Sequence, residues 1–112
     1  MSKPIVRSYS NYTEEAIILM ARLIRAARLE RELTAQEVAE RAGISRSMLQ
    51  RIEKADLKCE IGAVFEVAAI VGVKLFDAES TSLNKYILQT QEKLALLPQK
   101  TRKSTKVVDD DF

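Results

Sequence analysis

Residues 34–53 hold the pattern that most constrains the fold of this chain, two short amphipathic segments joined at a single glycine. Thr34 followed by Glu37 is a capping box, in which each side chain can bond the other residue's backbone amide, so a helix is expected to begin directly after Thr34. Gly43 can adopt the left-handed conformation that ends a helix, and Ser45 can cap the next one. The stretch therefore predicts two helices that meet at a tight turn.

The second of these helices is expected to have two different faces. Leu49 and Ile52 lie three residues apart on one face, and Ile44 is expected to pack across the turn. The side chains that project elsewhere are polar or basic: Arg46, Ser47, Gln50, Arg51 and Lys54. A helix-turn-helix uses such a free polar face to contact its target.

This stretch resembles the Cro/repressor class of helix-turn-helix, often called XRE-like. The similarity extends to Ile24–Arg28 and to Val64–Val73, which resemble the first and fourth helices of that family. The resemblance implies an all-α fold, a five-helix Cro/repressor-like (lambda-repressor-like) DNA-binding domain with an extra C-terminal dimerisation element. It also implies a homodimer that places two copies of the third helix in successive major grooves of double-stranded operator DNA, about 34 Å apart.

The resemblance also assigns roles to individual residues. Base edges would be contacted by Arg46, Ser47, Gln50 and Arg51, since arginine can bind guanine and glutamine can bind adenine. Phosphates would be contacted by Gln36, Lys54 and Lys58. Arg28 and Glu53 match positions that usually form a partly buried ion pair between the first and third helices.

Four positions depart from the family pattern. The family has glutamine as the first residue of the second helix, where this chain has Ala35, with Gln36 one residue later. Glu32 replaces the usual glycine between the first two helices, and a left-handed turn there would cost about 1 kcal/mol. Ala55 and Asp56 replace the glycine and polar residue that follow the third helix.

A closer resemblance is to HipB-type antitoxins. It is carried by Arg51–Lys54, Cys59–Ala68 and Gly72–Phe76, and by a basic tail that closes on Asp-Asp-Asp-Phe. It implies a repressor of its own toxin–antitoxin operon that binds a HipA-like serine/threonine kinase, whole or split into two chains. Two alternatives remain, a stand-alone or phage-type XRE repressor without a toxin partner, and a protein-interaction module that does not bind DNA.

The hydrophobic pattern predicts the remaining organisation. The first helix should begin near residues 11–13 and bury Ile17, Met20, Ala21, Ile24 and Ala27, which leaves Ile18, Leu19 and Leu23 outside its stripe. A fourth helix over about 60–71 should bury Ile61, Val64, Phe65, Ala68 and Val71. A further helix over about 82–97 has a seam of Leu83, Ile87, Thr90, Leu94 and Leu97.

Dimerisation is expected after Gly72, either through the leucine-rich seam, with Leu83, Ile87, Leu94 and Leu97, or through paired strands at 73–76. The domain organisation expected is a flexible N-terminal lead (1–10), a helix-turn-helix domain (11–76), a C-terminal helix (77–97) and a disordered charged tail (98–112).

Composition excludes several classes of function. The chain has no histidine and one cysteine, Cys59, so His-based catalysis and Cys/His zinc sites are not expected, and its three glycines form no phosphate loop. We therefore expect no enzyme activity, no metal and no cofactor.

The net charge is only +2, but residues 22–58 hold nine basic and six acidic residues. No signal peptide or membrane segment is recognisable and one cysteine excludes an internal disulfide, so an intracellular, reducing location without a membrane partner is expected. The resemblance to HipB-type antitoxins implies that this location is the bacterial cytoplasm, in association with the nucleoid.

Overall fold

The computed structural model describes residues 8–76 and 80–101. Within these residues the chain forms five helices and no strand: α1 (Asn11–Glu30), α2 (Ala35–Ala42), α3 (Arg46–Glu53), α4 (Ile61–Val71) and α5 (Ser80–Leu96). The all-α prediction is confirmed for this part of the chain. The first seven residues of the expected lead and residues 102–112 of the expected tail lie outside the described residues.

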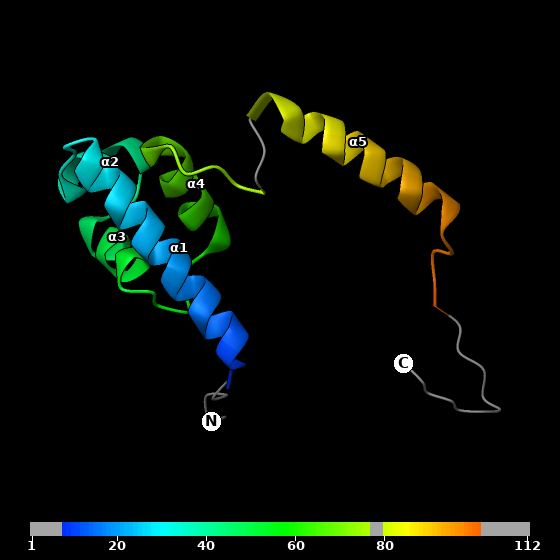
Figure 1. Ribbon diagram of the computed structural model, residues 1–112, viewed down its shortest axis with the longest axis horizontal. Coiled ribbons are helices and arrows are strands. Elements are labelled where there is room, and N and C mark those ends of the chain that lie inside the picture. Colours follow the sequence, from blue (N-terminus) through cyan, green and yellow to red (C-terminus); the bar gives the residue numbers. More distant parts are fainter. Residues whose placement is uncertain (1–7, 77–79, 102–112) are drawn as a thin grey trace. The chain divides into compact units, whose positions relative to one another are not determined.

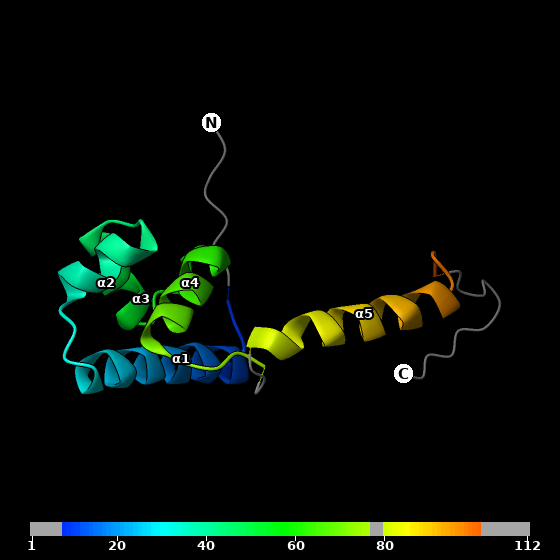
Figure 2. The same ribbon diagram turned by 90° about the horizontal axis from the view of Figure 1, so that it is seen from above.

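The chain divides after Asp77 into two units (Figure 1). The first unit holds α1 to α4, and the second holds α5. In the first unit, α2, α3 and α4 lie on the same side of α1 (Figure 2). The largest fully buried side chains come from all four of these helices: Ile24, Val38, Leu49, Val67 and Val71.

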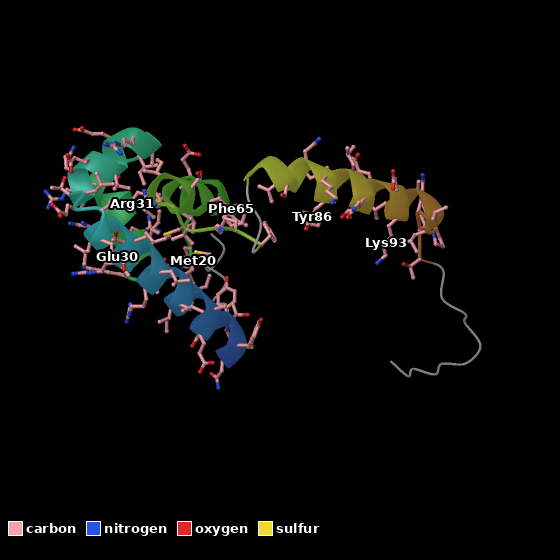
Figure 3. The ribbon with its side chains drawn as sticks, turned by 45° about the horizontal axis from the view of Figure 1, so that its top comes forward. Met20, Glu30, Arg31, Phe65, Tyr86 and Lys93 are labelled. Carbon is pink, nitrogen blue, oxygen red and sulfur yellow. The ribbon has the colours of Figure 1, made fainter. Side chains whose placement is uncertain are left out.

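Helix α1 begins where the sequence predicts. Ser10 caps it by accepting a hydrogen bond from the backbone amide of Thr13 at 3.2 Å. Its predicted stripe faces the core, with Ala21 and Ile24 buried and the other members half-buried. Met20 points from α1 toward α4 (Figure 3). The three residues predicted to lie outside the stripe are exposed, by 43% for Ile18, 60% for Leu19 and 45% for Leu23.

The predicted starts of α2 and α3 are both confirmed. Thr34 Oγ1 accepts from the Glu37 amide at 3.0 Å, and Glu37 Oε1 accepts from the Thr34 amide at 2.8 Å, which completes the capping box. Gly43 has φ 71°, the left-handed conformation that ends α2. Ser45 Oγ then accepts from the Met48 amide at 3.0 Å and starts α3.

Each of α1 to α4 ends in a Schellman motif, in which two amides beyond the helix bond back to carbonyls of its last turn. The motif needs one residue with positive φ, which is Glu32 (57°) after α1, Gly43 (71°) after α2, Ala55 (63°) after α3 and Gly72 (88°) after α4. Glu32, which replaces the family's glycine, therefore does adopt the left-handed conformation despite its cost, and Ala55 adopts it after α3.

The buried face of helix α4 differs from the predicted one. Ile61 was expected to be buried and is 70% exposed, whereas Val67, which was not on the predicted face, is fully buried. Ala68 and Val71 are buried as predicted, and Val64 and Phe65 are half-buried. Nearly every residue of α4 is apolar or small, so the spacing alone does not mark which side packs against the core.

Residues 73–76 continue from Gly72 as irregular backbone. The ring of Phe76 packs edge-on against that of Phe65 on α4, with centroids 6.1 Å apart. At Gly72 itself, the guanidinium of Arg31 occupies the space that a β-carbon would take, so only glycine fits there without a shift.

Helix α5 starts two residues before the predicted segment, and Leu97 follows its end. Its predicted seam is largely open to solvent in a single copy, with Ile87 52%, Leu94 60% and Leu97 47% exposed. Tyr86 and Lys93 project from the same side of this helix (Figure 3). Among the described residues, no helix combines the length and apolar character needed to cross a membrane.

Candidate nucleic-acid interface

The two sides of α3 have opposite surroundings. Leu49, Ile52 and Glu53 are buried against the rest of the first unit. The four residues expected to contact bases are exposed or half-buried, and an advance of about 100° per residue places them within roughly 140° of the helix circumference. We call this set the reading face: Arg46, Ser47, Gln50 and Arg51. It is a polar surface on an eight-residue helix whose opposite side is fixed in the core.

Glu53, the last residue of α3, is fixed by Arg28 of α1. Arg28 Nε lies 2.7 Å from Glu53 Oε2 and Nη2 lies 2.9 Å from Oε1, so the pair is bidentate. Only 11% of the Arg28 side chain and 7% of the Glu53 side chain are exposed. The hydrogen bond that Arg28 donates to Glu53 raises the pKa of Arg28, which keeps the guanidinium charged despite its burial. The pair fixes the orientation of α3 relative to α1.

Arg28 makes a third contact that the sequence does not predict. Its Nη1 donates to the backbone carbonyl of Leu33 at 3.0 Å, in the turn just before α2. One guanidinium therefore connects α1, the entry to α2 and the end of α3.

Arg51 of the reading face is paired with the loop that follows α3. Its Nε donates to Asp56 Oδ2 at 2.8 Å, and the other carboxylate oxygen, Oδ1, accepts from the Lys58 amide at 2.8 Å. The contact raises the pKa of Arg51 and lowers the pKa of Asp56. In the sequence, Asp56 stands out only as a replacement in the loop after α3, and its pairing with Arg51 is not predicted. The left-handed turn at Ala55, which returns the chain toward α3, gives no clear signal in sequence.

The residues expected to contact DNA phosphates differ in their surroundings. Gln36 is exposed on α2, but its amide donates to Glu40 Oε2 at 3.0 Å, so a phosphate would compete with that contact. Lys54 and Lys58 are exposed on either side of the α3–α4 turn, and neither forms a salt bridge within the described part of the chain. These two lysines flank the turn beside the reading face.

A groove of about 330 Å³ adjoins the same turn. Its apolar lining comes from Ile18, Ala55 and Leu57, and its charged rim comes from Glu14, Arg22 and Lys54. The exposed side chain of Ile18 is therefore part of a surface shared by α1 and the α3–α4 turn.

Cys59 lies next to this turn and is half-buried against the hydrophobic core. Burial raises the pKa of its thiol, which disfavours the reactive thiolate. The residue packs as a small apolar side chain.

The helix-turn-helix family model matches residues 24–76. Comparison with curated proteins and with solved structures gives no match. The matched segment begins within α1, contains α2, α3 and α4, and ends at Phe76. It includes the reading face, the Arg28–Glu53 pair and the α3–α4 turn, and it leaves α5 outside.

Proposed function

We propose, from the helix-turn-helix match over residues 24–76, that this protein is a sequence-specific transcriptional repressor that reads duplex DNA through α3. The observation that carries the proposal is the reading face, a set of four polar side chains on the free side of a helix whose other side is buried. Side chains on one face of a fixed helix can enter the major groove together, where each base pair presents a distinct pattern of donors and acceptors.

The chemistry of the reading face suits base recognition. Arg46 and Arg51 can each donate two parallel hydrogen bonds to guanine, and Gln50 can donate to and accept from adenine. Ser47 can bond either kind of base. Lys54 and Lys58 would neutralise phosphates beside the groove, and Gln36 would add a contact when it releases Glu40.

A repressor of this kind would bind as a homodimer, because two half-sites need two reading helices. The leucine seam of α5 supports this part of the proposal, since Ile87, Leu94 and Leu97 are about half exposed in one copy and could be covered by a second. The paired-strand route at residues 73–76 would require a change from the irregular backbone of the single chain.

The finer proposal is that the protein acts in the bacterial cytoplasm, at the nucleoid, as the antitoxin of a HipA-like kinase. Its support is the sequence resemblance to HipB-type antitoxins across Arg51–Lys54, Cys59–Ala68 and Gly72–Phe76. It would repress its own operon and bind the kinase, whether that is one chain or two. Co-purification with the product of a neighbouring kinase gene tests this role, and a gene neighbourhood without such a kinase would favour a stand-alone repressor.

The DNA-binding proposal is tested by separating base contacts from phosphate contacts. Arg46→Ala and Arg51→Ala should relax sequence preference, while Lys54→Ala and Lys58→Ala should weaken binding to all duplexes alike and reduce the salt dependence of the affinity. Binding isotherms on a selected operator and on scrambled duplex, at several salt concentrations, measure both effects.

Two results would count against the proposal. Unchanged sequence preference in both arginine variants would reject the reading face. Duplex binding that is absent, or that does not depend on salt, would instead favour a protein-interaction module.

A further inference from the structure

The end of α3 differs in one respect from the ends of the other three helices of its unit. In a Schellman motif the residue that directly follows the one with positive φ usually makes an apolar contact with the last turn of the helix. That residue is Leu33 after α1, Ile44 after α2 and Val73 after α4, whereas after α3 it is Asp56. Its amide bonds back to the carbonyl of Arg51 at 3.0 Å, so the motif itself is intact.

Asp56 uses the same position to contact the side chain of Arg51. Carboxylate oxygen Oδ2 accepts from Arg51 Nε, and Oδ1 accepts from the Lys58 amide, so the carboxylate is bonded on both sides. Backbone and side chain of Asp56 therefore both bond to the same residue of the reading face.

This arrangement leaves the outer edge of the guanidinium free. Nε is the nitrogen that bonds Asp56, and among the described residues the two Nη groups of Arg51 donate no hydrogen bond. An arginine binds the O6 and N7 atoms of guanine with two parallel N–H groups, and its outer edge offers such a pair.

The pair is poorly suited to stabilising the fold. The side chain of Arg51 is 43% exposed and that of Asp56 is 33% exposed, and ion pairs in contact with water contribute little to stability. An acidic side chain beside a DNA-binding helix also repels phosphate, so Asp56 weakens nonspecific attraction to DNA. An apolar residue at this position would stabilise the end of α3 at least as well.

We infer that Asp56 is a positioning residue, which holds the guanidinium of Arg51 in the orientation needed to bind guanine and thereby sets part of the base preference of α3. The inference rests on the proposed function, because it assigns a role within the same DNA-reading surface. Fixing a long, flexible side chain before binding reduces the entropy that is lost when the base contact forms.

The test uses the full chain and a pool of randomised duplexes from which the protein selects its preferred sequence. Asp56→Asn and Asp56→Ala should lower the preference for guanine at one position of each half-site by about tenfold, within the range of a lost bidentate contact. Both variants should bind scrambled duplex more tightly than the unmodified protein, because a negative charge has been removed.

The matched control is Glu60→Gln, which removes one negative charge from an exposed residue that makes no capping hydrogen bond at the start of α4. It should raise affinity for scrambled duplex in the same way but leave the guanine preference unchanged. Thermal unfolding of each variant establishes that the fold is retained.

A second control separates positioning from an effect on the loop. In an Arg51→Ala background, Asp56→Ala should have no further effect on base preference, since the side chain it positions is gone. An equal loss of preference in that background would show that Asp56 acts through the loop and would overturn the inference.

The remaining outcomes are also distinct. If the Asp56 variants keep or sharpen the guanine preference, the ion pair competes with DNA and the inference is wrong, while the proposed function stands. If Arg51→Ala leaves base preference unchanged, the inference fails and the reading face is reduced to its other members. If the unmodified protein selects no sequence at all, the proposed function fails as well.

Discussion

At the scale of single residues, Arg28 joins more of the first unit than any one contact suggests. Its guanidinium bonds both oxygens of Glu53 and the carbonyl of Leu33, and almost none of it is exposed. The sequence predicts the ion pair only through the family resemblance. It does not predict the Leu33 contact, because a bond to a backbone carbonyl depends on the path of the turn and not on the identity of the accepting residue.

The buried pair should be energetically coupled. Arg28→Ala or Glu53→Ala leaves an unpaired buried charge and should lower the free energy of unfolding by about 3 kcal/mol. The double variant should lose clearly less than the sum of the two single losses. Urea unfolding of the four proteins gives the coupling, and the exposed Arg51–Asp56 pair, treated in the same way, should show a much smaller one. Strictly additive losses at Arg28 and Glu53 would mean that they act as separate charges.

At the scale of elements, the helix starts were more predictable from sequence than the helix faces. Ser10, Thr34 and Ser45 cap their helices through local hydrogen bonds, and a local bond requires only residues that are close in sequence. The buried side of α4 was partly missed at Ile61 and Val67, because an apolar helix gives periodicity little contrast and tertiary packing selects the face. The Arg51–Asp56 contact was missed because it needs the positive φ of Ala55, which alanine rarely adopts.

The ends of α2 and α3 provide a matched pair of backbone tests. Ala55 has φ 63°, and Ala55→Gly should remove the backbone strain of this left-handed conformation. The free energy of unfolding should rise by about 0.5 kcal/mol, after the greater entropy of glycine in the unfolded chain is subtracted. Gly43 has φ 71° and open space where a β-carbon would lie, so Gly43→Ala should lose about 1 kcal/mol from backbone strain alone. Denaturant unfolding measures both, and changes of the same sign would contradict the assignment of left-handed strain at these two ends.

At the scale of the whole molecule, the division after Asp77 separates the helix-turn-helix match from α5. The first unit has a core of buried apolar side chains, whereas the described part of the second unit is a single helix with exposed leucines. A short amphipathic helix gains most of its stability when another surface covers its apolar side, and self-association would cover the seam of α5. The sequence predicts the seam, but no pattern within one chain specifies what covers it.

Truncation tests this division of roles. Removal of residues 99–112 should leave dimer formation and operator binding intact, although it could weaken binding to a kinase partner. Truncation before Leu83 should give monomers with weak affinity for DNA, because the second reading helix is no longer held nearby. Light scattering combined with operator titration measures both properties. A stable dimer that lacks everything after Ser82 would rule out the α5 route and favour either residues 73–76 or the exposed Ile18, Leu19 and Leu23 surface of α1.

The three-way contact of Arg28 also bears on the DNA. Because one buried guanidinium fixes α1, the entry to α2 and the end of α3, the reading face cannot tilt independently of the body that supports it. An operator whose groove does not match this fixed geometry would have to bend or change its groove width to meet the protein. The energy of that deformation depends on base steps that no side chain touches. The protein would then also prefer particular base pairs that it does not contact, because those base pairs determine how easily the duplex bends to fit a rigid domain.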